Sequence, residues 1–274
     1  MKNDNSSRFG KFLKLQWHVE DLYHAPCIGK LLPSCTLAGS VCSTYLLEKS
    51  RVVSHEANER NYHIFYQLLS APDEHKTKIW EGLLSKTEED FNYLGQTQIH
   101  VIEGHTDSER FLNTVNSLQL LRLTMEDIHT LFRALCIVLQ LGNLRFARDE
   151  HNEEGSCIAN EEELELLASI MGVSSDILKK SVTLRTIVIQ HEVVNVPLNP
   201  IVAKDSCDAL AKEIYAVTFD WLVKAINDAT CAESNYENAR DVGDSESYGT
   251  IGLLGKKQPF VASIIKFKVS NHIN

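Results

Sequence analysis

A short polar peptide near the start of the chain holds residue types that could bind a nucleotide. It reads Asn-Asp-Asn-Ser-Ser-Arg-Phe-Gly-Lys from Asn3 to Lys11. Hydroxyl oxygens can ligate Mg²⁺, side-chain amides can hold phosphate oxygens or waters, and an arginine can lock a closing loop through an ion pair. The residue types therefore indicate a magnesium-nucleotide site, and they leave open the alternative of a polar chain end that binds nothing.

A second group of chemically capable residues follows the first predicted strand. It consists of His18, His24, Cys27, Cys35 and Cys42. Their spacings match no common pattern of zinc ligands, and the chain holds no C-x-x-C pair. We interpret the segment as an irregular loop with incidental histidines and cysteines. The start of the chain has no apolar core, so no secretion signal is predicted and the cysteines are expected to be reduced thiols.

The composition is that of a folded protein with an acidic balance. Of the 274 residues, 43% are hydrophobic and 23% are charged, and the formal net charge is -10. An acidic balance disfavours a general binder of nucleic acid or of anionic membranes, because both need a basic surface. No run of about 18 apolar residues occurs, so no membrane insertion is predicted.

Strands at the start of the chain and helices in its middle must position the polar peptide. Strands are predicted from Phe9 to Trp17 and from Ser40 to Leu47, and the charged segment 48–59 is predicted as an exposed turn or loop. Capping-box patterns at Thr106 and Thr124 begin two helices. Further expected elements are a helix over 60–69, a polar loop over 148–155, helices over 161–171 and 203–229, a strand pair over 185–196 and a buried strand over 248–254.

Several stretches of the chain form an ordered series of longer motifs. They lie at 3–11, 44–53, 59–69, 139–144, 208–215 and 219–223. In this order they resemble the myosin motor domain, whose switch I has the pattern N-x-N-S-S-R-F-G-K. The resemblance extends from residue 3 to residue 254. It implies an α/β, P-loop NTPase-like motor fragment, from switch I to just before switch II, with a mostly helical upper fifty-kilodalton region and part of the central mixed sheet.

The resemblance implies a role for each residue of the polar peptide. Ser7 would ligate the Mg²⁺ of bound ATP, and Ser6 would help to position the attacking water. Asn3 would contact the nucleotide phosphates, with Asn5 in the same loop. Arg8 would pair with a glutamate of switch II and close the site. Ser6 and Arg8 are thus the implied catalytic residues, and all five residues are implied contacts of ATP and Mg²⁺.

The resemblance also implies partners and a location. The segment from Thr183 to Pro200 corresponds to an actin-contacting loop of the family, in which Arg185, Val188 and Glu192 are the candidate contacts. The expected partners are the actin filament and the remainder of the motor domain. The expected location is the cytoskeleton within the cytoplasm.

Two nucleotide motifs of the family have no counterpart in the sequence. No G-x-x-x-x-G-K-[ST] phosphate loop occurs. After Ile251 to Leu254 the chain continues Gly-Lys-Lys, where the family has the Asp, Gly and Glu of switch II, so Arg8 lacks its family partner. We therefore expect no ATP hydrolysis from the chain alone. A non-catalytic fragment that binds actin or another partner is the alternative function.

The motif series divides the chain into two parts. Residues 1–254 are expected to form the partial motor domain, comprising switch I, the upper actin-binding half and the strand that leads to switch II. Residues 255–274 depart from the family pattern. We hypothesise that this tail is translated intron sequence, because the codons for Gly-Lys-Lys can contain the nucleotide sequence of a common intron start.

Overall fold

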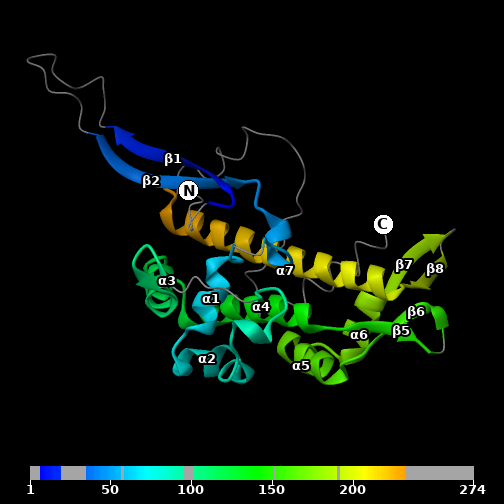
Figure 1. Cartoon of the computed structure of the whole chain (residues 1–274). Helices are drawn as coiled ribbons and strands as arrows, with labels where there is room; N and C mark the ends of the chain where they lie inside the picture. The colour runs from blue at the N-terminus through cyan, green and yellow to red at the C-terminus, as the bar shows by residue number, and fades with distance from the viewer. Residues whose placement is uncertain are drawn as a thin grey trace, which may run out of the picture.

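Helices form the body of the molecule and strand pairs project from it, as the computed structural model in Figure 1 shows. The structure describes residues 7–19, 35–56, 59–95, 101–150, 152–189 and 192–232. The α-helices are α1 (His63–Leu69), α2 (Asp73–Ile79), α3 (Asp107–Leu120), α4 (Met125–Asn143), α5 (Glu161–Met171), α6 (Ser175–Thr183) and α7 (Pro200–Thr230). The short 3-10 helices are η1 (Lys49–Val52), η2 (Glu81–Leu83) and η3 (Glu88–Asp90).

The described strands form antiparallel pairs, each of two strands. The pairs are β1 (Gly10–Val19) with β2 (Cys35–Tyr45), β3 (Val101–Ile102) with β4 (His105–Thr106), β5 (Phe146–Asp149) with β6 (Asn152–Ile158), and β7 (Leu184–Ile189) with β8 (Glu192–Pro197). The chain is therefore a mixture of helices and small sheets. No larger mixed sheet is formed among the described residues, and the strand predicted at 248–254 lies outside them.

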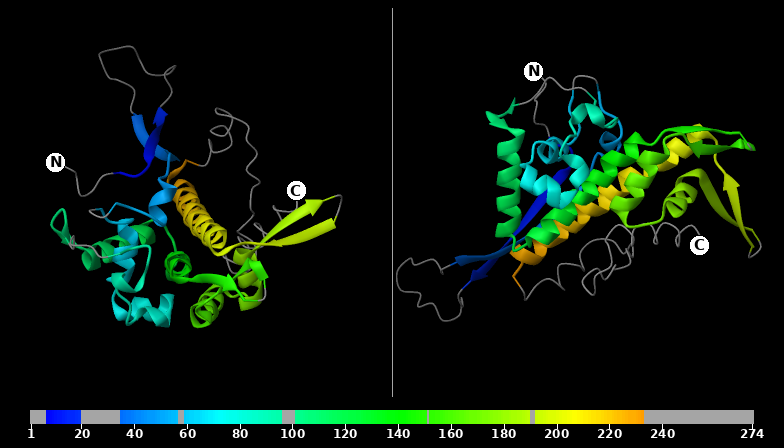
Figure 2. Two further views of the ribbon diagram at one scale, coloured as in Figure 1. Left: turned by 45° about the vertical axis from the view of Figure 1, so that its right-hand side comes forward. Right: turned by 90° about the horizontal axis from the view of Figure 1, so that it is seen from below.

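The core lies between α4 and α7, which run side by side (Figure 2). The capping box predicted at Thr124 is confirmed, because Thr124 Oγ1 accepts from the Asp127 N–H at 3.2 Å and Asp127 Oδ2 accepts from the Thr124 N–H at 3.1 Å. The apolar face that follows is buried, with Phe132 and Leu139 both 0% exposed. Burial of such a stripe is the main stabilising term for a helix in a folded protein.

Helix α7 begins three residues before the predicted start, for a reason that lies in its cap. The side chain of Asn199 accepts from the N–H groups of Ile201 and Val202, at 3.1 and 3.0 Å. Pro200 occupies the first turn, where its missing N–H costs no hydrogen bond. Asparagine followed by proline thus starts the helix directly after β8. No described helix combines the length and the apolarity needed to cross a bilayer.

Polar side chains at the end of α7 hold the β1–β2 pair in place. The Asn227 amide spans the backbone of Cys42: its Oδ1 accepts from the Cys42 N–H at 2.7 Å, and its Nδ2 donates to the Cys42 carbonyl at 2.9 Å. Thr230 donates to the Ser40 carbonyl at 3.0 Å. Gly39 lies so close to this end of α7 that an added Cβ would come within 2.7 Å of the Thr230 carbonyl. Side chains of α7 therefore take the place of a neighbouring strand along β2.

The substitution Asn227→Ala is expected to destabilise the chain by about 1–3 kcal/mol, because it leaves a backbone donor and acceptor of Cys42 without their partner. Urea unfolding followed by circular dichroism measures the loss. Asn113→Ala is the matched control, since Asn113 is exposed on α3. Equal unfolding midpoints for the two variants would show that the Asn227 contacts contribute nothing.

Two predictions about loops are wrong. Residues 48–59 contain η1, and Arg51 and Val52 within it are buried. Residues 148–155 belong largely to the β5–β6 pair, in which Arg148 lies opposite Ser156. An acidic composition predicted a solvated loop, but backbone pairing and the packing of buried Ile158 decide the structure there.

Helix α2 was not predicted. It begins at the residue after Pro72, and this proline ends the preceding segment.

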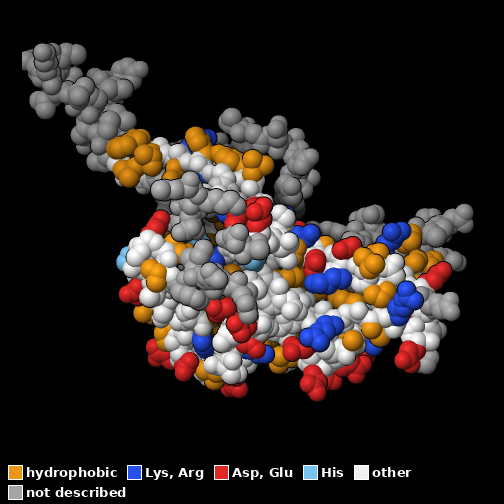
Figure 3. All heavy atoms as spheres, viewed as in Figure 1, with side chains coloured by type: hydrophobic (Ala, Val, Ile, Leu, Met, Phe, Trp, Pro, Cys, Tyr) orange, Lys and Arg blue, Asp and Glu red, His pale blue; other side chains and the backbone are white. Residues whose placement is uncertain are grey.

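The β1–β2 pair exposes apolar side chains. Phe12, Leu13, Leu15, Trp17 and Leu37 are each between 48% and 58% exposed. Figure 3 shows hydrophobic side chains gathered over these strands, away from the helical body. Monomeric soluble proteins seldom leave a patch of this kind open, so the patch indicates an interaction surface.

Candidate functional site

The polar peptide enters the described structure at Ser7 and Arg8, directly before β1. Ser7 is exposed, and its hydroxyl donates to the carbonyl of Phe9 at 2.8 Å. The Phe9 ring packs edge-on against Phe219 of α7, with ring centroids 4.9 Å apart. An aromatic contact with the long helix therefore fixes the end of the peptide. The other candidate residues, Asn3, Asn5 and Ser6, lie outside the described residues.

Arg8 is paired with two carboxylates from the segment between β2 and α1. Its Nη1 lies 3.4 Å from Glu48 Oε2, and its Nη2 lies 3.1 Å from Glu59 Oε2. The backbone joins the same contact, because the Glu48 N–H donates to the Arg8 carbonyl at 3.0 Å. These partners were not predicted. Sequence reasoning placed the partner of Arg8 in switch II, and nothing local in the sequence marks Glu48 or Glu59.

A second arginine completes this cluster from inside the fold. Arg51 is 4% exposed, its Nε lies 2.8 Å from Glu48 and its Nη2 lies 2.5 Å from Glu59. Burial alone would lower the pKa of Arg51, but the hydrogen bonds and charges of Glu48 and Glu59 outweigh it and raise the pKa. Two guanidinium groups thus share two carboxylates, so the charge of the cluster is balanced. We call Arg8, Glu48, Arg51 and Glu59 the arginine–glutamate cluster.

Tyr62 connects this cluster to the long helix. Its hydroxyl donates to the Glu48 carbonyl at 2.9 Å, and its ring stacks on Tyr215 of α7 with centroids 4.6 Å apart. Burial first, and then the negative charge of Glu48, raise the pKa of Tyr62 to about 12. The hydroxyl is therefore protonated at neutral pH and remains a donor.

Stability is expected to fall as the pH rises from about 10 to about 12. Over that window an unfolded tyrosine, with a pKa near 10, releases its proton, while Tyr62 in the folded chain keeps its own. Unfolding is therefore favoured by added base. Urea unfolding at pH 9 and at pH 11 measures the change, and Tyr62→Phe should reduce the pH dependence. A variant as sensitive to pH as the natural chain would contradict the assignment to Tyr62.

The cluster continues into the body of the protein through Arg60. The carbonyl of Arg60 accepts from Arg51 Nη1 at 2.7 Å. Its guanidinium pairs with Asp107, at the start of α3, at 2.6 Å and lies 3.8 Å from the centre of the Tyr66 ring. The side chains of Arg60 and Asp107 are 2% and 11% exposed. A connected set of polar contacts thus runs from the polar peptide to α3.

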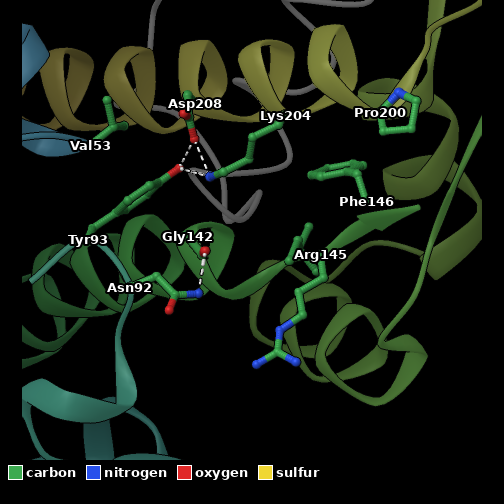
Figure 4. Close-up of a pocket in the computed structure, with 10 residues that line it drawn as sticks. Val53, Asn92, Tyr93, Gly142, Arg145, Phe146, Pro200, Lys204 and Asp208 are labelled. Atoms are coloured by element: carbon green, nitrogen blue, oxygen red, sulfur yellow. Dashed lines mark hydrogen bonds and ion pairs between the residues drawn. The ribbon is translucent and has the colours of Figure 1, made fainter. Parts of the chain in front are cut away.

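A separate pocket of about 470 Å³ opens between the end of α4 and the first turns of α7. Figure 4 shows Tyr93 pointing at Lys204 and Asp208, whereas Arg145 points away from them. The Tyr93 hydroxyl and Lys204 Nζ each lie 2.5 Å from Asp208 Oδ1. The lysine and the carboxylate neutralise each other, so these groups are better suited to fastening α7 to the segment after η3, which carries Tyr93, than to binding a phosphate.

The candidate actin contacts lie on the β7–β8 pair, so the predicted strand pair is confirmed. Arg185 is exposed on β7 opposite Val196. In the backbone register of the pair, Val188 is the partner of Val193 and Glu192 is the partner of Ile189. Figure 2 shows the pair extending outward at the start of α7. The three candidates therefore share one projecting element.

No group of three or more His, Cys, Asp or Glu side chains suited to a metal ion occurs among the residues that the structure describes. Of the five residues weighed as a possible zinc cluster, Cys42 lies on β2 as a free thiol. Neither His24 nor Cys27 lies within the described residues, so the loop interpretation of that segment stays a prediction.

These features define a class of protein. It is a mixture of helices and small sheets in which a polar peptide, with residue types that suit Mg²⁺ and phosphate, is attached to a long helix. Comparison with known proteins gives the family. The profile of the myosin head (motor domain) family matches residues 1–245, and the chain belongs to this family. The resemblance found in the sequence is thereby confirmed.

Curated relatives agree with this assignment. Unconventional myosin-Ic of Aquarana catesbeiana is 35% identical over 254 residues, which are 93% of this chain and 22% of that protein. Myosin-17 of Arabidopsis thaliana is 31% identical over 100% of this chain and 17% of its own length. Myosin-J heavy chain of Dictyostelium discoideum is 33% identical over 91% of this chain and 10% of its own length. The chain thus spans about a fifth or less of these relatives.

Proposed function

We propose that the chain supplies the nucleotide-sensing switch I and part of the actin-binding surface of an ATP-driven motor of the cytoskeleton. Membership of the myosin head family supports this proposal. The observation that carries it is the attachment of the polar peptide to the helical body through Arg8, Glu48 and Glu59. A switch must be in contact with the part of the protein that it controls, and the arginine–glutamate cluster provides this contact with the helical body.

The residues of the peptide fit a magnesium nucleotide in their chemistry. Ser7 offers an exposed hydroxyl, and hydroxyl oxygen is a hard donor of the kind that Mg²⁺ prefers. MgATP would supply the transferred phosphoryl group and the cation. Ser7 would hold the cation, Ser6 would orient the attacking water, and Asn3 and Asn5 would hold phosphate oxygens. Positioning and charge neutralisation together are what phosphoryl transfer requires of a protein.

Arg8 would report the state of the switch to the body. Its guanidinium is shared between Glu48 and Glu59, so a shift of the peptide towards a nucleotide would stretch those ion pairs. Glu48 and Glu59 also bind Arg51, which donates to the Arg60 carbonyl at 2.7 Å. A movement of Arg8 would therefore change the buried contacts of Arg51 as well as the exposed surface.

Helix α7 would connect the nucleotide end of the fragment to its actin end. It has 31 residues and is about 46 Å long at 1.5 Å per residue. It begins directly after the β7–β8 pair that carries the candidate actin contacts, and it ends beside β2, where Asn227 binds Cys42 (Figure 1). A rigid helix of this length can carry a displacement between the two ends.

The open face of the β1–β2 pair would receive the remainder of the motor domain in a P-loop NTPase-like mixed sheet. Trp17, Leu15 and Leu37 are exposed there, and β1 pairs with no described strand other than β2, so its second edge can receive further strands. The partial central sheet inferred from the sequence is thus proposed to form in the complete motor.

A chimeric motor tests the proposal. Residues 1–245 replace the aligned segment in the motor domain of the Dictyostelium discoideum myosin-J heavy chain, and Mg²⁺-dependent ATP turnover is measured with and without actin filaments. We expect turnover that actin accelerates, and none above background from the 274-residue chain alone. A chimera that melts like its parent but does not hydrolyse ATP would refute the proposal.

A non-catalytic actin-binding fragment is the second candidate function, because the chain itself forms the β7–β8 pair on which Arg185 is exposed. Co-sedimentation of the chain with actin filaments tests it. Arg185→Glu should weaken binding about fivefold, as expected for a charge at the rim of an interface. Arg122→Glu, at an exposed position between α3 and α4, is the control. Failure of the natural chain to sediment with actin would exclude this function.

A further inference from the structure

Two histidines from different helices meet at the surface, away from the switch peptide. His75 lies on α2 and His129 lies on α4. His75 Nδ1 and His129 Nε2 are 3.3 Å apart, a distance at which one ring donates a hydrogen bond to the other in the absence of a metal, and the ring centroids are 5.6 Å apart with 67° between the ring planes. Both side chains are half-buried, so solvent reaches the pair.

Contacts that do not involve this nitrogen pair hold both helices in position. The His75 ring packs edge-on against Phe111 of α3, which is 0% exposed, with ring centroids 5.2 Å apart. Arg133, one turn after His129 on α4, donates to the carbonyls of Ile79 and Lys78 at 2.9 and 3.2 Å. The distance between the two imidazoles is therefore set by the packing of α2 against α4, before any ligand binds.

This distance suits a tetrahedral metal ion. Two nitrogens bound to zinc at 2.0–2.1 Å in a tetrahedron are about 3.3 Å apart, whereas neighbouring ligands of an octahedral ion at a similar bond length are about 3.0 Å apart. We propose that His75 and His129 form a two-histidine zinc site that joins α2 to α4. In this site His75 would carry its proton on Nε2 and His129 on Nδ1, which leaves a lone pair on each of the two facing nitrogens.

The surroundings limit what the site can bind. No third His, Cys, Asp or Glu side chain completes a cluster among the described residues, so water would have to supply the other ligands. Lys78 and Arg133 place positive charge near His129. This charge weakens the binding of every cation. The choice between metals rests on the ligands: hard cations such as Mg²⁺ and Ca²⁺ need oxygen ligands, whereas imidazole nitrogen favours a transition metal such as zinc. Because zinc would bind the folded arrangement of both helices, it would raise the stability of the chain.

Zinc titration of the 274-residue chain, followed by calorimetry and by thermal melting, tests the site. We expect one saturable zinc ion that raises the melting temperature. His75→Gln and His129→Gln should each weaken binding about tenfold or more and remove the rise. His105→Gln, at an exposed position on β4, is the matched control and should behave like the natural chain. Equal binding by all three variants, or no saturable binding by the natural chain, would overturn the proposal.

A second measurement decides the matter if a variant does not fold, and it uses the natural chain alone. Imidazoles are modified with diethylpyrocarbonate with and without zinc, and the labelled peptides are quantified by mass spectrometry. We expect zinc to protect His75 and His129 together while His105 reacts as before. Labelling of His75 and His129 that zinc does not change would overturn the proposal.

Discussion

Replacing Asp107 with alanine is expected to lower the free energy of unfolding by about 3–5 kcal/mol, the cost of leaving a buried charge without its partner. The Arg60 guanidinium is 2% exposed and pairs with Asp107 at 2.6 Å. Its Nη2 makes this contact, whereas its Nε and Nη1 have no hydrogen-bond partner among the described residues. A loss of this size is a large share of the 5–15 kcal/mol by which domains are typically stable. Urea unfolding followed by circular dichroism measures it.

The matched control for this prediction lies on the same helix. Glu109 accepts from the Thr106 N–H at 2.8 Å in the capping box of α3, and its side chain is exposed. Glu109→Ala should therefore cost clearly less than Asp107→Ala. If the two variants unfold at the same urea concentration, the ion pair between Arg60 and Asp107 is not the main polar contact that holds α3.

Replacing Arg8 with alanine in the chimeric motor is expected to reduce ATP turnover about 100-fold or more. The variant keeps the Ser7 hydroxyl but loses the group that ties the peptide to Glu48 and Glu59. A misplacement of about 1 Å at a reacting centre has a cost of this order. Single-turnover measurement with excess enzyme separates this loss from slow release of product.

Lys11→Ala is the control for the Arg8 variant, because Lys11 is exposed on β1 three residues further along the same motif. We expect turnover close to that of the unmodified chimera. Thermal melting of both variants shows whether each retains the fold. Unchanged turnover in a folded Arg8→Ala chimera would mean that the arginine–glutamate cluster has no part in the switch.

Helix ends were predictable from the sequence because their signals are local. The capping boxes at Thr106 and Thr124 are confirmed by hydrogen bonds between residues three apart. Gly172 ends α5 with φ +67°, a conformation that costs glycine little. The strand pair predicted over 185–196 is likewise formed by residues close in the chain, as Arg185 opposite Val196 shows. In each case the deciding contacts lie within a few residues of one another.

The polar contacts were not predictable, because their partners are far apart in the chain. The charge of Arg51 predicts an exposed position, but Glu48, Glu59 and the Arg60 carbonyl make its burial favourable. His75 and His129 are 54 residues apart and carry no shared motif. Motif resemblance gave the roles of Asn3, Asn5 and Ser6, which stay predictions.

The structure of the chimeric motor with a bound magnesium nucleotide tests the proposed role of the polar peptide most directly. We expect the Ser7 hydroxyl to lie in the coordination sphere of the magnesium ion, with Asn3 and Asn5 beside the phosphates. A nucleotide-bound chimera in which residues 3–11 lie away from the phosphates and the metal would contradict it.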